Sequence, residues 1–142
     1  MSASRGLFRL QQVDRQIDRS NARLAAIRET LENDVELRKA LDNLEKTKAG
    51  QFKAEQGLKQ IEAEVKSQQI KIQQAESSLY GGSVHNPKEL QDLQKDIASL
   101  KKHLSTLEER ELDAMQILET AEAEHKQASA TLEQLQAHLG EE

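Results

Sequence analysis

Four histidines and 25 carboxylates are the side chains of this sequence that could bind a metal ion or move a proton. A zinc site needs three or four converging ligands, and one helical turn brings together residues three or four apart. No two histidines have that spacing; they are His85, His103, His125 and His138. Cysteine is absent, which excludes thiol chemistry and disulfides. We therefore expect no metal site and no cofactor within these 142 residues.

Catalytic motifs are missing as well. The sequence has no glycine-rich phosphate loop, no Ser-His-Asp set and no nucleophile elbow. The carboxylates fall on solvated helix faces, where nothing dries them or raises their pKa. We expect a protein that is not an enzyme.

The composition indicates the elements that carry these side chains. Charged residues make up 32% of the chain and aromatic residues 2%, with a single proline. A compact two-layer domain needs more large apolar side chains and turns, whereas regularly spaced Leu, Ile and Val argue against disorder. The sequence therefore predicts an all-α protein of long helices. No apolar run approaches the roughly 18 residues of a membrane span, so we expect no membrane partner and a cytoplasmic location.

The helical pattern is interrupted once, between Tyr80 and Glu89. Gly81 suits the left-handed position that ends a helix, and Gly82 loosens the turn. Asn86 is a good N-cap, Pro87 suits the first helical position, and Glu89 completes an Asn version of the capping box. We expect a single hairpin over 1–142: a helix over 4–79, a tip loop over 80–86 and a second, antiparallel helix over 87–139.

The second helix carries the clearer seam, a stripe of residues with alternating steps of three and four. Thirteen of its fifteen positions are apolar, which is typical of a coiled coil. The fifteen are Leu90, Leu93, Ile97, Leu100, Leu104, Leu107, Glu111, Ala114, Leu118, Ala121, His125, Ala128, Leu132, Leu135 and Leu139. Glu111 and His125 are the polar exceptions, and such residues usually select register and partner. For His125 a buried pH switch is the alternative.

The first helix shows two seams separated by a change of phase. One runs from Leu58 to Leu79 and the other from Leu10 to Leu31. Between them Leu37, Leu41 and Leu44 are apolar, whereas Lys48, Gln51 and Glu55 are not. Gly50 and Gly57 fall in the same stretch, and each costs about 1 kcal/mol relative to Ala. We expect a weak zone or bend at 45–57.

Folding the helices with Leu79 facing Leu90 pairs residues whose numbers add up to about 169. This register pairs Ile72 with Ile97, Leu41 with Ala128 and Leu31 with Leu139. Glu142 then reaches only about residue 27, which leaves 1–26 without an intrachain partner. We expect this segment to be an association surface for a homodimer or a protein partner; its residues are Leu7, Leu10, Val13, Ile17, Leu24, Arg15, Arg19 and Arg23.

The tip resembles a known bacterial family. The segment from Leu79 to Lys95 matches a pattern close to Leu-Tyr-x-Gly-x-Val-x-Asn-Pro-Lys-Glu-Leu, found at the tip of proteins with a long antiparallel coiled coil and a C-terminal four-cysteine zinc ribbon. These proteins are described as nucleic-acid-binding or regulatory, and one is a flagellar regulator that chaperones an alternative sigma factor. The paired cysteines of the ribbon are absent here, so zinc is expected only in that missing half.

The resemblance and the residues together lead to two functional hypotheses. The first is a coiled-coil adaptor, regulatory or chaperone-like, that docks a cytoplasmic protein partner. Its tip would offer Tyr80, Gly81, Val84, Asn86, Pro87, Lys88 and Glu89, although Tyr80 could instead cover the end of the seam. The alternative is a nucleic-acid-linked factor, favoured by six arginines over 1–28. A longer second helix, as the family has, would also be expected to cover the apolar stripe of 1–26.

Overall fold

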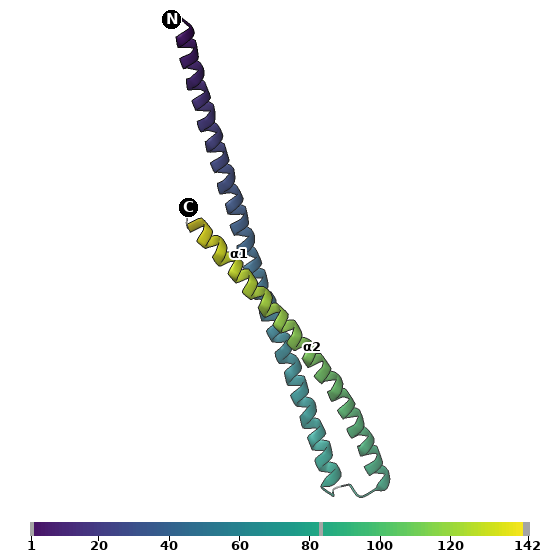
Figure 1. The fold of residues 1–142 in the computed structure, drawn as a ribbon. Helices are drawn as coiled ribbons and strands as arrows, with labels where there is room; N and C mark the ends of the chain where they lie inside the picture. Colours follow the sequence, from purple (N-terminus) through teal and green to yellow (C-terminus); the bar gives the residue numbers. More distant parts are fainter. Residues whose placement is uncertain (1, 83, 141–142) are drawn as a thin grey trace. The chain divides into compact units, whose positions relative to one another are not determined.

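The computed structural model describes residues 2–82 and 84–140, so Ser83 of the tip and Glu142 lie outside it. Two helices account for nearly all of these residues, α1 (Ser2–Tyr80) and α2 (Pro87–Gly140), and the described residues contain no strand. Figure 1 shows α1 and α2 joined through the short tip. The predicted all-α antiparallel coiled-coil hairpin is confirmed. The helix ends differ slightly, because α1 begins at Ser2 instead of Ser4 and includes Tyr80.

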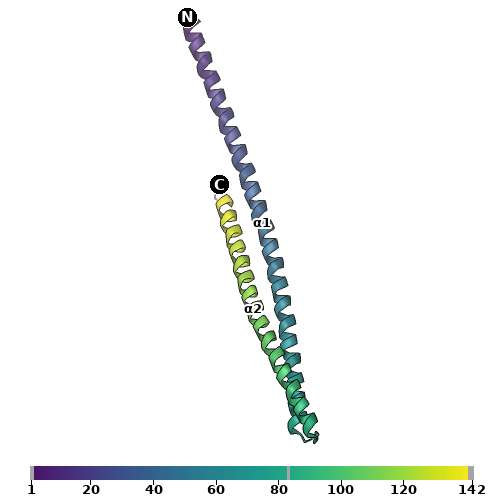
Figure 2. The same cartoon turned by 90° about the vertical axis from the view of Figure 1, so that its right-hand side faces the viewer.

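Packing divides the chain into two compact units. The first combines residues 1–43 with 130–142, and the second is residues 44–129. The second unit contains the tip and the two helix segments that lead into and out of it, which lie side by side in both views (Figures 1 and 2). Each unit has its own buried residues: Leu132 in the first, and Val65, Ile72, Ile97, Leu107, Ala114 and Ala128 in the second.

The seam predicted for α2 is confirmed position by position. All fifteen residues from Leu90 to Leu139 are buried or half-buried. Elsewhere in α2 only Ser129 and Ala130 are not exposed. Steps of three and four average 3.5 residues, close to the 3.6 of a helical turn, so one face of α2 stays in contact along its length.

The change of phase predicted for α1 is present but lies nearer the N-terminus than expected, between Leu31 and Asn33. Its buried and half-buried residues keep the alternation of three and four without a break from 33 to 79. Between Leu37 and Leu58 the seam passes through Ala40, Leu44, Thr47, Gln51 and Ala54. Apart from Leu44 these residues are small or polar and give little apolar signal. The residues chosen from the sequence, Leu41, Lys48 and Glu55, stand one position later than Ala40, Thr47 and Ala54. The seam is therefore continuous in phase but poor in large apolar side chains.

Two of the predicted pairings, Leu41 with Ala128 and Leu31 with Leu139, are wrong because neither leucine lies on the observed seam of α1. Leu41 and Leu31 are exposed, whereas Ala40 and Leu37 are half-buried. A shift of one residue turns a side chain by about 100° around the helix. Leu41 and Leu31 therefore belong to a different face of α1 from the hairpin seam.

Polar contacts within residues 44–129 agree with the predicted register. The Gln68 side-chain amide donates to the Leu100 carbonyl at 2.9 Å, and Gln68 is only 5% exposed. Further along, the Thr47 hydroxyl lies 3.4 Å from Nδ1 of His125, and it also donates to the Leu44 carbonyl. The residue numbers add up to 168 for Gln68 and Leu100 and to 172 for Thr47 and His125, close to the predicted sum of 169. The polar seam residues therefore bond across the hairpin, as buried polar groups must.

The stretch 45–57 is α-helical throughout. A Cβ built on Gly50 or on Gly57 would meet nothing within 4 Å. Neither glycine serves a close approach of the helices, so each contributes only its low helix propensity. Local fraying or fast amide exchange in 45–57 stays a prediction.

Replacing both Gly50 and Gly57 with Ala should raise the free energy of unfolding by about 2 kcal/mol, because each site is an ordinary helical position with room for a methyl group. Chemical denaturation followed by circular dichroism measures the change. Gly81→Ala is the matched control and should destabilise, because its Cβ would lie 2.5 Å from the Ser77 carbonyl oxygen. Destabilisation by the Gly50 and Gly57 changes would contradict this assignment.

Replacing Gln68 with Leu should raise the free energy of unfolding by about 1 kcal/mol. The Leu100 carbonyl keeps its helical hydrogen bond, and a buried amide is exchanged for an apolar seam residue of similar size. The exposed neighbour supplies the control, Gln69→Leu, which should change stability little. A loss of stability for Gln68→Leu alone would show that the cross-helix bond outweighs apolar packing.

Candidate functional site

The tip is built by the end of α1 and the start of α2. The Gly81 N–H donates to the Ser77 carbonyl at 2.8 Å and closes the last turn of α1. Gly82 then takes the left-handed conformation, with φ of 74°. The predicted roles of the two glycines were wrong in this respect. Gly82 provides the left-handed turn, and Gly81 is needed because a side chain there would collide with the backbone of α1.

Asn86 starts α2 as predicted. Its side-chain oxygen accepts from the Lys88 N–H at 2.9 Å, and its carbonyl accepts from the Leu90 N–H, also at 2.9 Å. This is the N-cap geometry, with Pro87 at the first helical position. The second half of the capping box, a bond from the Asn86 N–H to Glu89, is not among the hydrogen bonds of the described residues.

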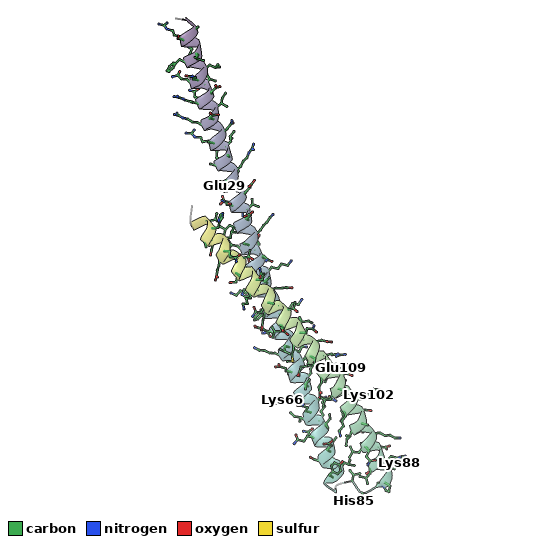
Figure 3. The ribbon with its side chains drawn as sticks, in the orientation of Figure 1. Glu29, Lys66, His85, Lys88, Lys102 and Glu109 are labelled. Carbon is green, nitrogen blue, oxygen red and sulfur yellow. The ribbon has the colours of Figure 1, made fainter. Side chains whose placement is uncertain are left out.

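The predicted tip residues are presented to solvent. Tyr80 is 81% exposed, so it does not cover the end of the hairpin seam. Val84 is half-buried, and the rest are exposed: Gly81, Asn86, Pro87, Lys88 and Glu89. Figure 3 labels His85 on the loop and Lys88 on the first turn of α2. The structure thus brings an exposed phenol, an imidazole and an ammonium group to one end of the hairpin.

An ion pair ties the two helices together behind the tip. Nζ of Lys101 lies 2.9 Å from a carboxylate oxygen of Glu76. This hydrogen bond, followed by the negative charge of Glu76, raises the pKa of the Lys101 ammonium. Tyr80 makes the smallest contribution to the same upward shift of the pKa. The contact orients the last turn of α1 relative to α2 without enclosing either group.

The second predicted site lies on α1 within the unit formed by 1–43 and 130–142. Its apolar side chains are each 49–59% exposed: Leu7, Leu10, Val13, Ile17 and Leu24. Arg15, Arg19 and Arg23 are exposed too. At about 100° per residue the apolar side chains share one face of α1, whereas the three arginines lie on the other side of the helix. This face belongs to the first unit, whereas the tip belongs to the second.

Sequence reasoning missed how far the apolar face extends. Ile27, Leu31 and Val35 are 51–58% exposed and continue it. The signal was available, because the seam spacing runs from Leu10 to Leu31. It was hidden by the assumption that Leu31 belongs to the hairpin seam.

Among the described residues we find no metal-binding cluster, and the hollow described below is not shielded from solvent. Within 2–82 and 84–140, no three His, Asp or Glu side chains lie close enough together to hold a metal ion. A hollow beside Gly50, flanked by Asp113, Ile117 and Glu124, is open to solvent. No helix in the described part of the chain is long and apolar enough to cross a membrane.

Comparison with known proteins agrees with this geometry. A family model described as the CT398-like coiled coil hairpin domain matches residues 10–142. No curated protein and no solved structure matches the chain. The match covers both helices and the tip, and it does not extend to a zinc ribbon. A coiled-coil hairpin of this kind is an interaction module, and the chain belongs to the CT398-like coiled coil hairpin domain family.

Proposed function

We propose that the chain is a non-enzymatic adaptor, regulatory or chaperone-like, that docks a cytoplasmic protein partner through the tip of the hairpin. It acts without a metal or cofactor of its own. The hairpin supplies a stiff support, and the tip supplies the contact surface. Partner specificity comes from the side chains around the turn.

The exposure of Tyr80 is the observation that carries this proposal. An aromatic side chain that is 81% exposed in the folded chain has nearly all of its apolar area available to a partner. Tyrosine is enriched among residues that dominate binding energy, because it buries a large rigid ring and keeps a hydroxyl for a hydrogen bond. Caps on both sides of the turn hold the backbone around it. A partner therefore meets a surface that is already ordered.

Charged side chains near the tip would surround Tyr80 in a complex and form the polar rim of the interface. Lys88 and Glu89 are exposed on the first turn of α2. Lys101, about four turns into α2, pairs with Glu76, about one turn before the end of α1. Such rims contribute more to selectivity and association rate than to affinity. Resemblance to a family with a sigma-factor chaperone makes a transcription regulator a reasonable class of partner.

The absence of a dry cleft in the described residues supports a binding role over catalysis. A carboxylate acts as an acid or base near neutral pH when burial or a neighbouring charge shifts its pKa. The carboxylates of α1 and α2 are solvent-exposed except for half-buried Glu55, Glu76 and Glu111. Of these, Glu76 is engaged with Lys101. A docking surface needs no such perturbed group.

Tyr80→Ala should weaken binding of the partner by at least about tenfold, the loss expected for a tyrosine anchor. The partner is first trapped in cells of the source organism with a photo-crosslinking amino acid at position 80. It is then purified and titrated against the full chain. The matched control is Gln69→Ala, an exposed position on α1 away from the turn.

Two results would contradict tip docking. One is a partner that crosslinks equally well from position 69 and from position 80. The other is a partner whose affinity Tyr80→Ala leaves unchanged. Circular dichroism should show that the variants remain helical, because Tyr80 makes little buried contact.

The arginines of α1 favour a second candidate, a regulatory factor linked to nucleic acid. Arg5, Arg9, Arg19 and Arg23 are exposed and lie within about 80° of one another around the helix. Four phosphate contacts predict that the logarithm of the duplex binding constant falls with the logarithm of salt concentration with a slope of about −4. Titrating duplex DNA at several salt concentrations tests this directly. A flat salt dependence or no binding would favour the adaptor.

A further inference from the structure

The apolar face of the N-terminal part of α1 has the spacing of a second coiled-coil seam. Its six large residues follow steps of three and four, with Ser20 at the centre; they are Leu10, Val13, Ile17, Leu24, Ile27 and Leu31. We refer to this set as the N-terminal stripe. Every member is 49–59% exposed. An isolated helix with such a stripe is marginal in water and requires a partner.

The N-terminal stripe lies on a different face from the hairpin seam. Asn33 and Leu37 are half-buried seam residues of the same unit, whereas Leu31 and Val35 are exposed. Continuing the seam spacing back from Asn33 reaches residues that are mostly polar or basic: Thr30, Ala26, Arg23, Arg19, Gln16, Gln12, Arg9 and Arg5. A helix that continued α2 in the same register would face these residues and not the stripe. The observed phase therefore favours a second chain over a longer second helix as the partner of the stripe.

We infer that the N-terminal stripe pairs antiparallel with the same stripe of a second copy of this chain, over residues 7–35. Steps of three and four alternate along the stripe in either direction, as they do along the two helices of the hairpin. Two antiparallel copies that overlap end to end therefore bring Leu10 near the partner's Leu31 and Ile17 near the partner's Leu24. Four heptads, about 43 Å of helix, are then shared.

Charges beside the stripe favour the antiparallel arrangement over the parallel one. With the stripes overlapped end to end, Asp14 lies across from the partner's Arg28, and the symmetry repeats this attractive pair. A parallel pair would instead set Arg23 against the partner's Arg28 and Arg9 against the partner's Asp14, so that a repulsive pair would offset the attractive one. Like charges at such flanking positions select against a pairing. The apolar ends also match, because Leu7 lies across from the partner's Val35.

The exposed large apolar residues of α2 do not form a comparable surface. Leu112 and Met115 each follow a seam position of α2, whereas Ile117 precedes one, so they flank the seam on opposite sides. They make no continuous stripe. Leu112, at 65% exposed, provides a matched control for substitutions in the N-terminal stripe.

Sedimentation equilibrium of the full chain tests the pairing. We expect a monomer–dimer equilibrium with a dissociation constant in the micromolar range or below. Ile17→Lys should raise that constant at least about a hundredfold, because each dimer loses two packed side chains and gains two unpaired charges. Leu112→Lys should leave it unchanged. A monomer at about 100 µM, or a dimer that Ile17→Lys does not weaken, would overturn the proposal.

Two experiments distinguish an antiparallel dimer from a parallel one: reversal of a charge beside the stripe, and a spin-label distance between the two chains. Arg28→Asp should weaken the dimer about tenfold by opposing Asp14, and the added change Asp14→Arg should restore it. A spin label at Gln11 should lie about 30 Å from its copy in the antiparallel dimer and about 15 Å or less in a parallel one. The antiparallel model predicts weakening by Arg28→Asp and the long distance. A dimer that Arg28→Asp strengthens, or a short Gln11 distance, would overturn it.

Discussion

The contact of two helices through one unbroken seam is the constraint on which the rest of the structure depends. Side chains at steps of three and four keep α1 and α2 in contact because this spacing nearly matches the helical turn. Burial follows that spacing from Asn33 to Leu79 on α1 and from Leu90 to Leu139 on α2. Within each unit this register decides which side chains of α1 and α2 face one another and which face solvent.

The seam changes character along its length. Towards the tip it contains Val65, Ile72, Ile97 and Leu107, which are buried. Near 45–57 it contains Thr47, Gln51 and Ala54 instead, and polar contacts such as Thr47 to His125 replace part of the apolar packing. Small and polar seam residues bury less apolar area, and each buried side chain contributes less to stability. Stability should therefore be concentrated near the tip, which suits a surface that must be ordered before it binds.

The sequence alone predicted the fold class, the seam of α2 and the cap at Asn86, because each depends on a local pattern that residue type reveals. It did not predict the seam of α1 through Ala40, Thr47 and Ala54, since burial there comes from the facing helix and not from large apolar side chains. The glycine roles were exchanged because residue type permits a left-handed backbone at both positions and only the geometry of the turn selects Gly82. The residues of the tip and the exposed residues of the N-terminal part of α1 were predicted from the sequence. That the exposed apolar face extends to Ile27, Leu31 and Val35 became clear only from the observed phase of the hairpin seam.

The central claim is that α1 carries two faces that differ in phase by one residue, one used by the hairpin and one left for association. Thiol-labelling rates along α1 test it most directly, with single cysteines introduced one at a time into this cysteine-free chain. The account predicts slow labelling at 33, 37, 40, 44, 47, 51, 54 and 58 at every protein concentration. It predicts a second set of slow positions, 10, 13, 17, 24, 27 and 31, that appears only as concentration rises. Slow labelling at 31, 41, 48 and 55 in dilute solution, with fast labelling at 40, 47 and 54, would contradict it.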